Sequence, residues 1–111
     1  MKITVKKVDC RKYKNVAYYR SDRKSPLGNP YIVGKDGNRS QCILKFMRLF
    51  NDSAKGLPMR EHVRKIVARA IQGNFKELCF TCHCAPDTCH SDVIALYAKN
   101  VYGCLTYTPA F

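Results

Sequence analysis

An apolar run, a turn and a helical pattern follow one another within residues 78–102 of this 111-residue chain. Residues 78–84 predict a buried strand, because apolar and small side chains fill most of the positions. The Ala-Pro-Asp-Thr segment at 85–88 predicts a turn, and residues from about 89 to 102 carry apolar side chains at helical spacing. A strand that passes directly into a helix is typical of the sheet edge where open α/β folds place their functional sites.

The rest of the chain supplies partners for this strand–turn–helix unit. We expect strands at 3–8 and 16–20, an extended segment at 31–33, a largely buried helix from a cap at Ser40 to residue 50, and a helix from Pro58 to residue 72. Asp87 or Thr88 would cap the last helix. Together these elements predict an α/β fold with a small, mostly parallel sheet flanked by helices, similar to a Rossmann arrangement.

The length of the chain allows one modest hydrophobic core, so residues 1–111 are expected to form a single domain. Residues 103–111 would be either an edge strand or an extended tail. No stretch approaches the roughly 18 apolar residues of a membrane span, and the first residues lack the apolar centre of a signal peptide. We therefore expect a cytoplasmic protein with no membrane partner, and its odd number of cysteines, seven, indicates reduced thiols.

Positive charge is concentrated in the first two-thirds of the chain. Residues 1–72 contain 18 Lys and Arg against 5 Asp and Glu, a net +13, whereas the remainder contains 2 against 3, a net −1. The outer face of the second predicted helix carries the residues expected to contact nucleic acid, Arg60, Arg64, Lys65 and Arg69. Such charge indicates a polyanionic partner, namely nucleic acid, a nucleotide or an acidic protein; the alternative is a surface that only keeps the protein soluble.

Four cysteines and two histidines fall within residues 79–90, and they support three interpretations. In the first, Cys89 and His90 occupy the first turn of the last helix. Backbone N–H groups and the helix dipole stabilise a thiolate or a bound phosphate at that position. Cys89 would then be a catalytic nucleophile, or part of an anion site, with His90 as its acid–base partner.

The second interpretation is a zinc site, and zinc is the candidate cofactor. Thiolates and imidazole bind zinc tetrahedrally, and the ligands would be Cys82, Cys84, Cys89 and His90. The third interpretation is that these side chains only pack between a strand and a helix, because free cysteine is among the most buried residue types. Packing is the preferred interpretation for the remaining cysteines, Cys10, Cys42, Cys79 and Cys104.

Two motifs resemble those of a family common in bacteriophages, catalogued as domain of unknown function 4326. The first is Leu-Gly-Asn-Pro-Tyr at 27–31, and the second is Cys-His-Cys-Ala-Pro-Asp-Thr-Cys-His-Ser-Asp-Val-Ile at 82–94. The resemblance covers about residues 16–98 and leaves the basic stretch 1–15 outside it. His83 stands where family members often carry Trp.

The resemblance implies a compact α/β fold, a phage origin and a shared site. The site would contain Gly28, Asn29, Pro30, Cys82, Cys84, Cys89, His90 and Asp92. Glycine permits close approach of a ligand to the backbone, and an Asn side chain offers amide hydrogen bonds. Because both motifs follow predicted strands, they are expected to converge in one crevice at the edge of the sheet.

Two functions follow from these observations. The first is a small phage-type protein that binds a nucleotide or a nucleic-acid phosphate at the Cys/His site, through Gly28, Asn29, Pro30 and Asp92. Chemistry at Cys89 would make this protein an enzyme. The alternative is a non-enzymatic basic module, zinc-stabilised or metal-free, that binds nucleic acid or an acidic host protein. In either case the location would be the cytoplasm, that of the host cell if the protein is phage-encoded.

Overall fold

Three parallel strands form the sheet in the order β1-β3-β2, so the last of them in the sequence lies in the centre. The strands are β1 (Lys2–Lys7), β2 (Val16–Arg20) and β3 (Glu77–Cys82), and the helices are α1 (Arg39–Asn51), α2 (Leu57–Gln72) and α3 (His90–Val101). The computed structural model describes residues 1–84, 87 and 89–107. The predicted α/β class with a small parallel sheet in a single domain is confirmed.

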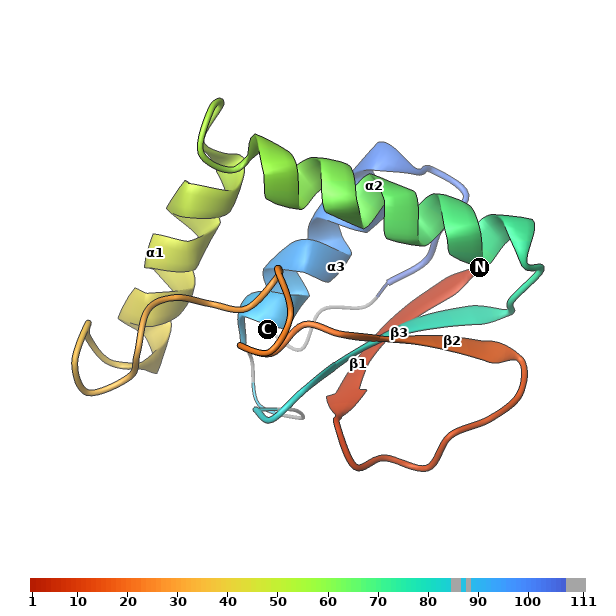
Figure 1. Ribbon diagram of the computed structural model, residues 1–111, viewed down its shortest axis with the longest axis horizontal. Helices are drawn as coiled ribbons and strands as arrows, with labels where there is room; N and C mark the ends of the chain where they lie inside the picture. The colour runs from red at the N-terminus through yellow and green to blue at the C-terminus, as the bar shows by residue number, and fades with distance from the viewer. Residues whose placement is uncertain (85–86, 88, 108–111) are drawn as a thin grey trace.

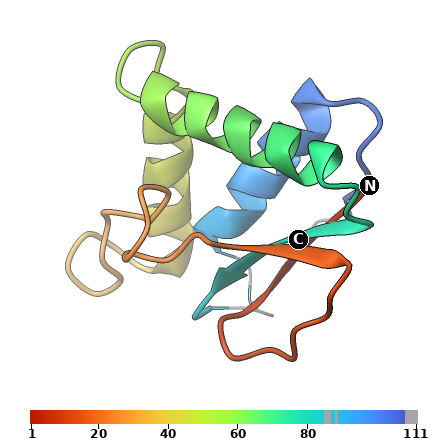
Figure 2. The same cartoon turned by 45° about the vertical axis from the view of Figure 1, so that its right-hand side comes forward.

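The helices lie on one side of the sheet, as two views of the molecule show (Figures 1 and 2). α2 and α3 pack against the strands, and α1 packs against α2 and α3. Side chains alternate along each strand, which turns Ile3, Leu78 and Phe80 toward the helices and into the hydrophobic core. The described residues thus form two layers, whereas a Rossmann fold carries helices on both faces of its sheet.

α1 is less buried than the sequence predicts. Phe46 and Phe50 are fully buried against the other helices, but Leu44 is 46% exposed and Met47 is 38% exposed. The prediction of a largely buried helix is therefore wrong, because α2 and α3 cover one side of α1 and leave these two apolar residues in solvent.

Two predicted helix caps move to neighbouring residues. Asn38, rather than Ser40, caps α1: its Oδ1 accepts from the Gln41 N–H at 2.9 Å, while the Gln41 side chain accepts from the Asn38 N–H at 2.8 Å. This reciprocal pair satisfies two helix N–H groups at once. Cys89, rather than Asp87, is the N-cap of α3, and the alternative cap Thr88 lies outside the described residues.

Residues 31 and 32, in the segment predicted to be extended, precede a turn and belong to no strand of the sheet, and β3 ends at Cys82 rather than at residue 84. A turn begins at Val33, because the backbone groups find partners within the loop. The Ile32 N–H donates to Asp36 Oδ2 at 2.8 Å, and the Gly34 N–H donates to the Gly37 carbonyl at 2.8 Å.

The C-terminal segment reaches the free side of β1. Thr106 forms a single parallel bridge with Lys2, and its carbonyl accepts from the Ile3 N–H at 2.8 Å. The described part of this tail is thus an addition to the sheet edge, and residues 108–111 of the predicted tail lie outside the described residues. Cys104 is exposed, so the packing interpretation is wrong for that cysteine.

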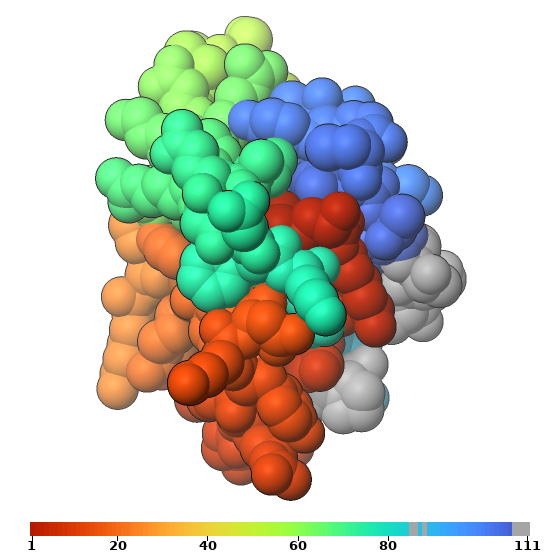
Figure 3. Space-filling view, turned by 90° about the vertical axis from the view of Figure 1, so that its right-hand side faces the viewer, coloured from red at the N-terminus to blue at the C-terminus, as the bar shows by residue number. Residues whose placement is uncertain are grey.

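The basic loop between β1 and β2 protrudes from the sheet on the side away from the helices (Figure 3). Arg11, Lys12 and Lys14 of this loop are exposed. Across the residues that the structure describes, no helix combines the length and apolar composition needed to cross a membrane.

Replacing Phe80, the core residue at the centre of the sheet, should lower the stability of the protein strongly. Phe80 is fully buried at the middle of β3, so Phe80→Ala is expected to lower the free energy of unfolding by about 3–5 kcal/mol. Met47→Ala on the exposed face of α1 is the matched control and should change it by less than about 0.5 kcal/mol. Urea unfolding followed by circular dichroism measures both, and equal effects would contradict the assigned core.

Candidate functional site

A cleft of about 360 Å³ opens at the carboxyl ends of β2 and β3. The loop after β2 runs from the sheet to α1 and forms one wall (Figure 1). The lining comes from residues 22–24, Asn29 and Tyr31 of that loop, Arg39 and Cys42 of α1, residues 82–84, and His90. The structure thus brings the Asn29 motif and the Cys/His motif, which are far apart in the sequence, into the wall of one cleft.

Buried Ser21 joins the three segments that meet behind this cleft. Its N–H donates to the Thr81 carbonyl at 2.9 Å, and its hydroxyl lies 2.6 Å from the Ser91 hydroxyl. Its carbonyl accepts from His90 Nε2. Ser21 therefore connects the end of β2 to β3 and to the first turn of α3. Sequence reasoning missed it, because a serine in a polar loop carries no signal of burial.

The His90 side chain is buried and uncharged, and it lines the cleft. Burial lowers the pKa of its imidazole, and its ring packs edge-on against Phe46 with centroids 5.1 Å apart. Since the Ser21 carbonyl can only accept, Nε2 of His90 must carry the proton. The imidazole is thus held as a donor to the backbone at this nitrogen, which therefore does not act as a base.

Cys89 does not have the environment of an activated nucleophile. It is 3% exposed, and its sulfur lies 3.3 Å from that of Cys82. The Cys82 thiol and burial raise the pKa of Cys89, which is opposite to the direction expected from the helix N-terminus. The helix end is already occupied, because the Asp92 carboxylate accepts from the Cys89 N–H at 2.9 Å. A negative charge at this position reduces the attraction of the helix end for another anion.

The proposed zinc ligands are not assembled. Within residues 1–84, 87 and 89–107, no group of three or more His, Cys, Asp or Glu side chains is placed to hold a metal ion. Cys84 packs against the Cys82–Cys89 pair, but Nε2 of His90 is directed at the Ser21 carbonyl. The geometry therefore does not support a site made of these four side chains.

The Gly-Asn-Pro loop builds the wall of the cleft through internal contacts. Asn29 Oδ1 accepts from the Tyr31 N–H at 2.9 Å, and its Nδ2 donates to the Cys42 carbonyl at 3.3 Å. A Cβ atom on Gly28 would lie 2.6 Å from the Arg23 Cα, so only glycine fits this close approach without a shift of the backbone. Pro30 is exposed and does not line the cleft.

A family model described as a domain of unknown function, DUF4326, matches residues 3–100. The chain belongs to this family. The match begins at residue 3, inside the basic stretch 1–15 that the resemblance left out, so the family domain includes nearly all of β1 as well as the cleft. No curated protein and no solved structure gives a significant match.

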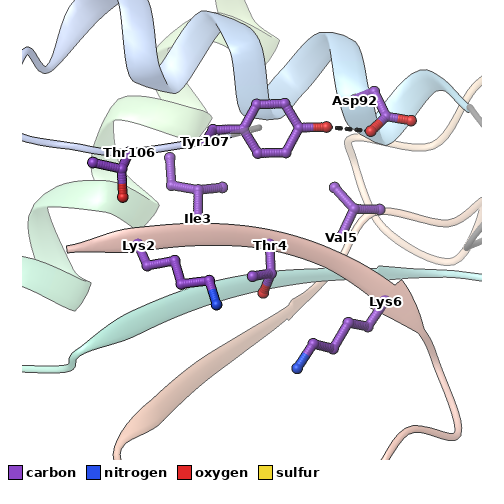
Figure 4. A pocket seen from close by; sticks show the side chains of 8 residues that line it. All are labelled: Lys2, Ile3, Thr4, Val5, Lys6, Asp92, Thr106 and Tyr107. Carbon is purple, nitrogen blue, oxygen red and sulfur yellow. Dashed lines mark hydrogen bonds between the residues drawn. The ribbon is translucent and has the colours of Figure 1, made fainter. Parts of the chain in front are cut away.

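Within this DUF4326 domain, Asp92 lies beside a different hollow from the cleft. Tyr107 donates a hydrogen bond to its carboxylate, above the β1 residues Ile3 and Val5 (Figure 4). Burial and the neighbouring carboxylate raise the pKa of Tyr107, which keeps the phenol protonated as the donor. Asp92 thus anchors the C-terminal segment and caps α3, and it does not line the cleft to which it was assigned.

The charged residues of the cleft come from positions that sequence reasoning did not select. Arg23, Lys24 and Arg39 line it and are exposed. Asp22 is buried, and its hydrogen bond from Arg20 lowers the pKa of its carboxyl, so it is ionised. His83 Nε2 lies 3.1 Å from the same carboxylate. Arg23 and Lys24 precede the Gly-Asn-Pro motif by a few residues, and Arg39 is the first residue of α1. This proximity to the motif and to a helix start is the signal in the sequence that could have identified them.

The predicted basic face of α2 is only partly free, and none of its residues lines the cleft. Arg60 donates to the Phe50 and Asp52 carbonyls and so ties down the loop before α2. Arg64 Nε donates to the Tyr97 hydroxyl at 3.0 Å. Lys65 and Arg69 are exposed. The four residues therefore do not act as one uniform surface.

The buried neutral His90 should make stability depend on pH. Its pKa in the folded protein lies below the ordinary value of 6.5, so below pH 6.5 the unfolded chain binds protons that the folded protein does not. The free energy of unfolding should fall by up to about 1.4 kcal/mol per pH unit there, and the contribution of His90 is complete above pH 6.5.

Urea unfolding at pH 7.5, 6.0 and 5.0 measures this dependence. His90→Gln removes the titrating group, so its stability should fall less steeply with acid than that of the natural protein. An identical pH dependence in both proteins would contradict a buried neutral imidazole at this position.

Proposed function

We propose that the cleft at the carboxyl ends of β2 and β3 binds a phosphorylated small molecule, with a nucleotide as the favoured class. The observation that carries this proposal is the set of three exposed cations, Arg23, Lys24 and Arg39, around one cleft. Arginine binds phosphate through two parallel N–H···O bonds, and lysine adds a compact positive charge. A volume of about 360 Å³ falls in the range of small-molecule sites.

The walls of the cleft suit the uncharged part of such a ligand. Tyr31, Val33 and Ile43 line it and present an aromatic ring and two branched side chains. Small-molecule sites combine apolar walls with a few polar groups that fix orientation. A nucleotide suits both parts of the cleft, since its planar base fits the apolar walls and its anionic phosphate fits the cations.

The charge distribution favours the α1 side of the cleft for the phosphate. The first turn of α1 contains no acidic residue and carries Arg39, whereas the first turn of α3 contains Asp92. Since a carboxylate offsets the positive end of a helix, α1 is the better partner for an anion. The proposal requires no covalent step at Cys89, whose sulfur is buried and whose pKa is raised.

A second candidate is binding of nucleic acid through the basic surface outside the cleft. It is favoured by the exposed cations Lys65 and Arg69 on α2 and by the protruding loop with Arg11, Lys12 and Lys14. Such binding would depend on contacts to phosphates and would weaken steeply with salt. A phage origin, with a location in the host cytoplasm, remains part of either proposal.

Calorimetric titration with nucleoside mono-, di- and triphosphates, and with inorganic phosphate as the minimal ligand, tests the cleft. Arg23→Ala and Arg39→Ala should each weaken nucleotide binding about tenfold or more, because a hydrogen bond to a charged group contributes roughly 1.5–3 kcal/mol. Lys65→Ala on α2 is the matched loss of one positive charge and should leave the affinity unchanged.

Other results of the same titrations separate the candidates. Binding of a single-stranded oligonucleotide that is weakened by Lys65→Ala and Arg69→Ala, but not by Arg39→Ala, would favour the basic surface. The cleft proposal is rejected if no phosphorylated ligand binds, or if neither Arg23→Ala nor Arg39→Ala changes the affinity.

A further inference from the structure

Two buried cysteines face each other at the junction of β3 and α3. Cys82 is the last residue of β3, and Cys89 immediately precedes α3. Their sulfur atoms are 3.3 Å apart, and the two side chains are 0% and 3% exposed. Cys84 is half-buried, packs against this pair and lines the cleft. Two nucleophilic side chains are thus held in contact with each other, and a third connects them to a solvent-accessible surface.

We propose that Cys82 and Cys89 are a redox-active dithiol that closes reversibly to an intramolecular disulfide. A disulfide bond is about 2.05 Å long, so the two sulfurs need to approach by only about 1.2 Å. Six residues separate the two cysteines in the sequence, which lets the pair close without displacing another strand or helix. The inference concerns only these sulfurs and does not depend on the ligand proposed for the cleft.

The chemical step is an exchange with a small disulfide such as oxidised glutathione. The sulfur–sulfur bond of oxidised glutathione breaks, and a bond forms between the sulfurs of Cys82 and Cys89. The glutathione disulfide is reduced to two thiols, which take up the two protons that leave the cysteines. Such exchange passes through a mixed disulfide, and Cys84 is the accessible thiol next to the pair where it can begin.

The environment of Cys82 and Cys89 is suited to keeping both side chains as thiols in the reduced protein. The Cys82 thiol and burial raise the pKa of Cys89, so Cys89 is held as the protonated thiol. Its nearest reaction partner is the neighbouring sulfur. Oxidation would tie the end of β3 to the start of α3, and would therefore fix residues 82–84 relative to His90 in the wall of the cleft.

Disulfide mapping of the full-length protein tests this proposal without any substitution. The protein is equilibrated with excess oxidised glutathione, its remaining thiols are blocked with N-ethylmaleimide under unfolding conditions, and the chain is cleaved at Lys, Arg and Asp. The expected product links peptide 77–86 to peptide 87–91 and has lost two hydrogen atoms. Reduced glutathione in excess should reverse the link.

Three serine variants identify the sulfurs. Cys82→Ser and Cys89→Ser should abolish the link, whereas Cys84→Ser should slow its formation and still show it at equilibrium. The proposal is overturned if Cys82 and Cys89 of the natural protein are both blocked by maleimide in excess oxidised glutathione. It is also overturned if the link persists in Cys82→Ser, because another cysteine of peptide 77–86 would then be the partner of Cys89.

Discussion

The cleft depends on the hydrogen bonds of one buried serine. Ser21 follows β2 directly and bonds to the Thr81 carbonyl, to the Ser91 hydroxyl and to His90. These partners belong to β3 and to the first turn of α3, so the end of one strand, the centre of the sheet and a helix start are held at one point. A buried backbone or hydroxyl group that loses its partner costs roughly 1–3 kcal/mol, which makes this junction a strong constraint on the geometry around it.

The polar residues around this junction divide into those whose side chains bond within the protein and those that present positive charge at the cleft. The side-chain polar atoms of Asn29 and Asp92 form hydrogen bonds within the protein. Asn29 bonds to its own loop and to α1, and Asp92 bonds to Cys89 and Tyr107. Arg23 and Arg39 remain exposed at the cleft, where Arg23 Nε also donates to the Asn29 carbonyl at 3.4 Å, and their charge would meet the proposed ligand. The Gly-Asn-Pro and Cys/His segments of this DUF4326 domain thus contribute mainly to shape, while neighbouring cations contribute charge.

The sequence predicts the elements well where periodicity decides them, as in β2, α2 and α3; most of the turn predicted at 85–88 lies outside the described residues. It also predicts that the Asn29 and His90 segments meet. It does not predict Ser21, because the burial of that residue requires β2 to lie beside β3, and strand order is set by long-range pairing. The pKa of Cys89 was assigned the wrong direction for a similar reason, since the helix end is a local feature and the Cys82 sulfur is a tertiary neighbour.

We propose that the cleft next to the Ser21 junction is where a ligand binds. Hydrogen exchange followed by mass spectrometry, with and without a nucleoside triphosphate, tests it on the unaltered protein. Binding in the cleft should slow the exchange of residues 21–31, of the first turns of α1 and of the end of β3, with no change along the outer face of α2. Protection confined to α2 and the β1–β2 loop, with none around the cleft, would contradict it.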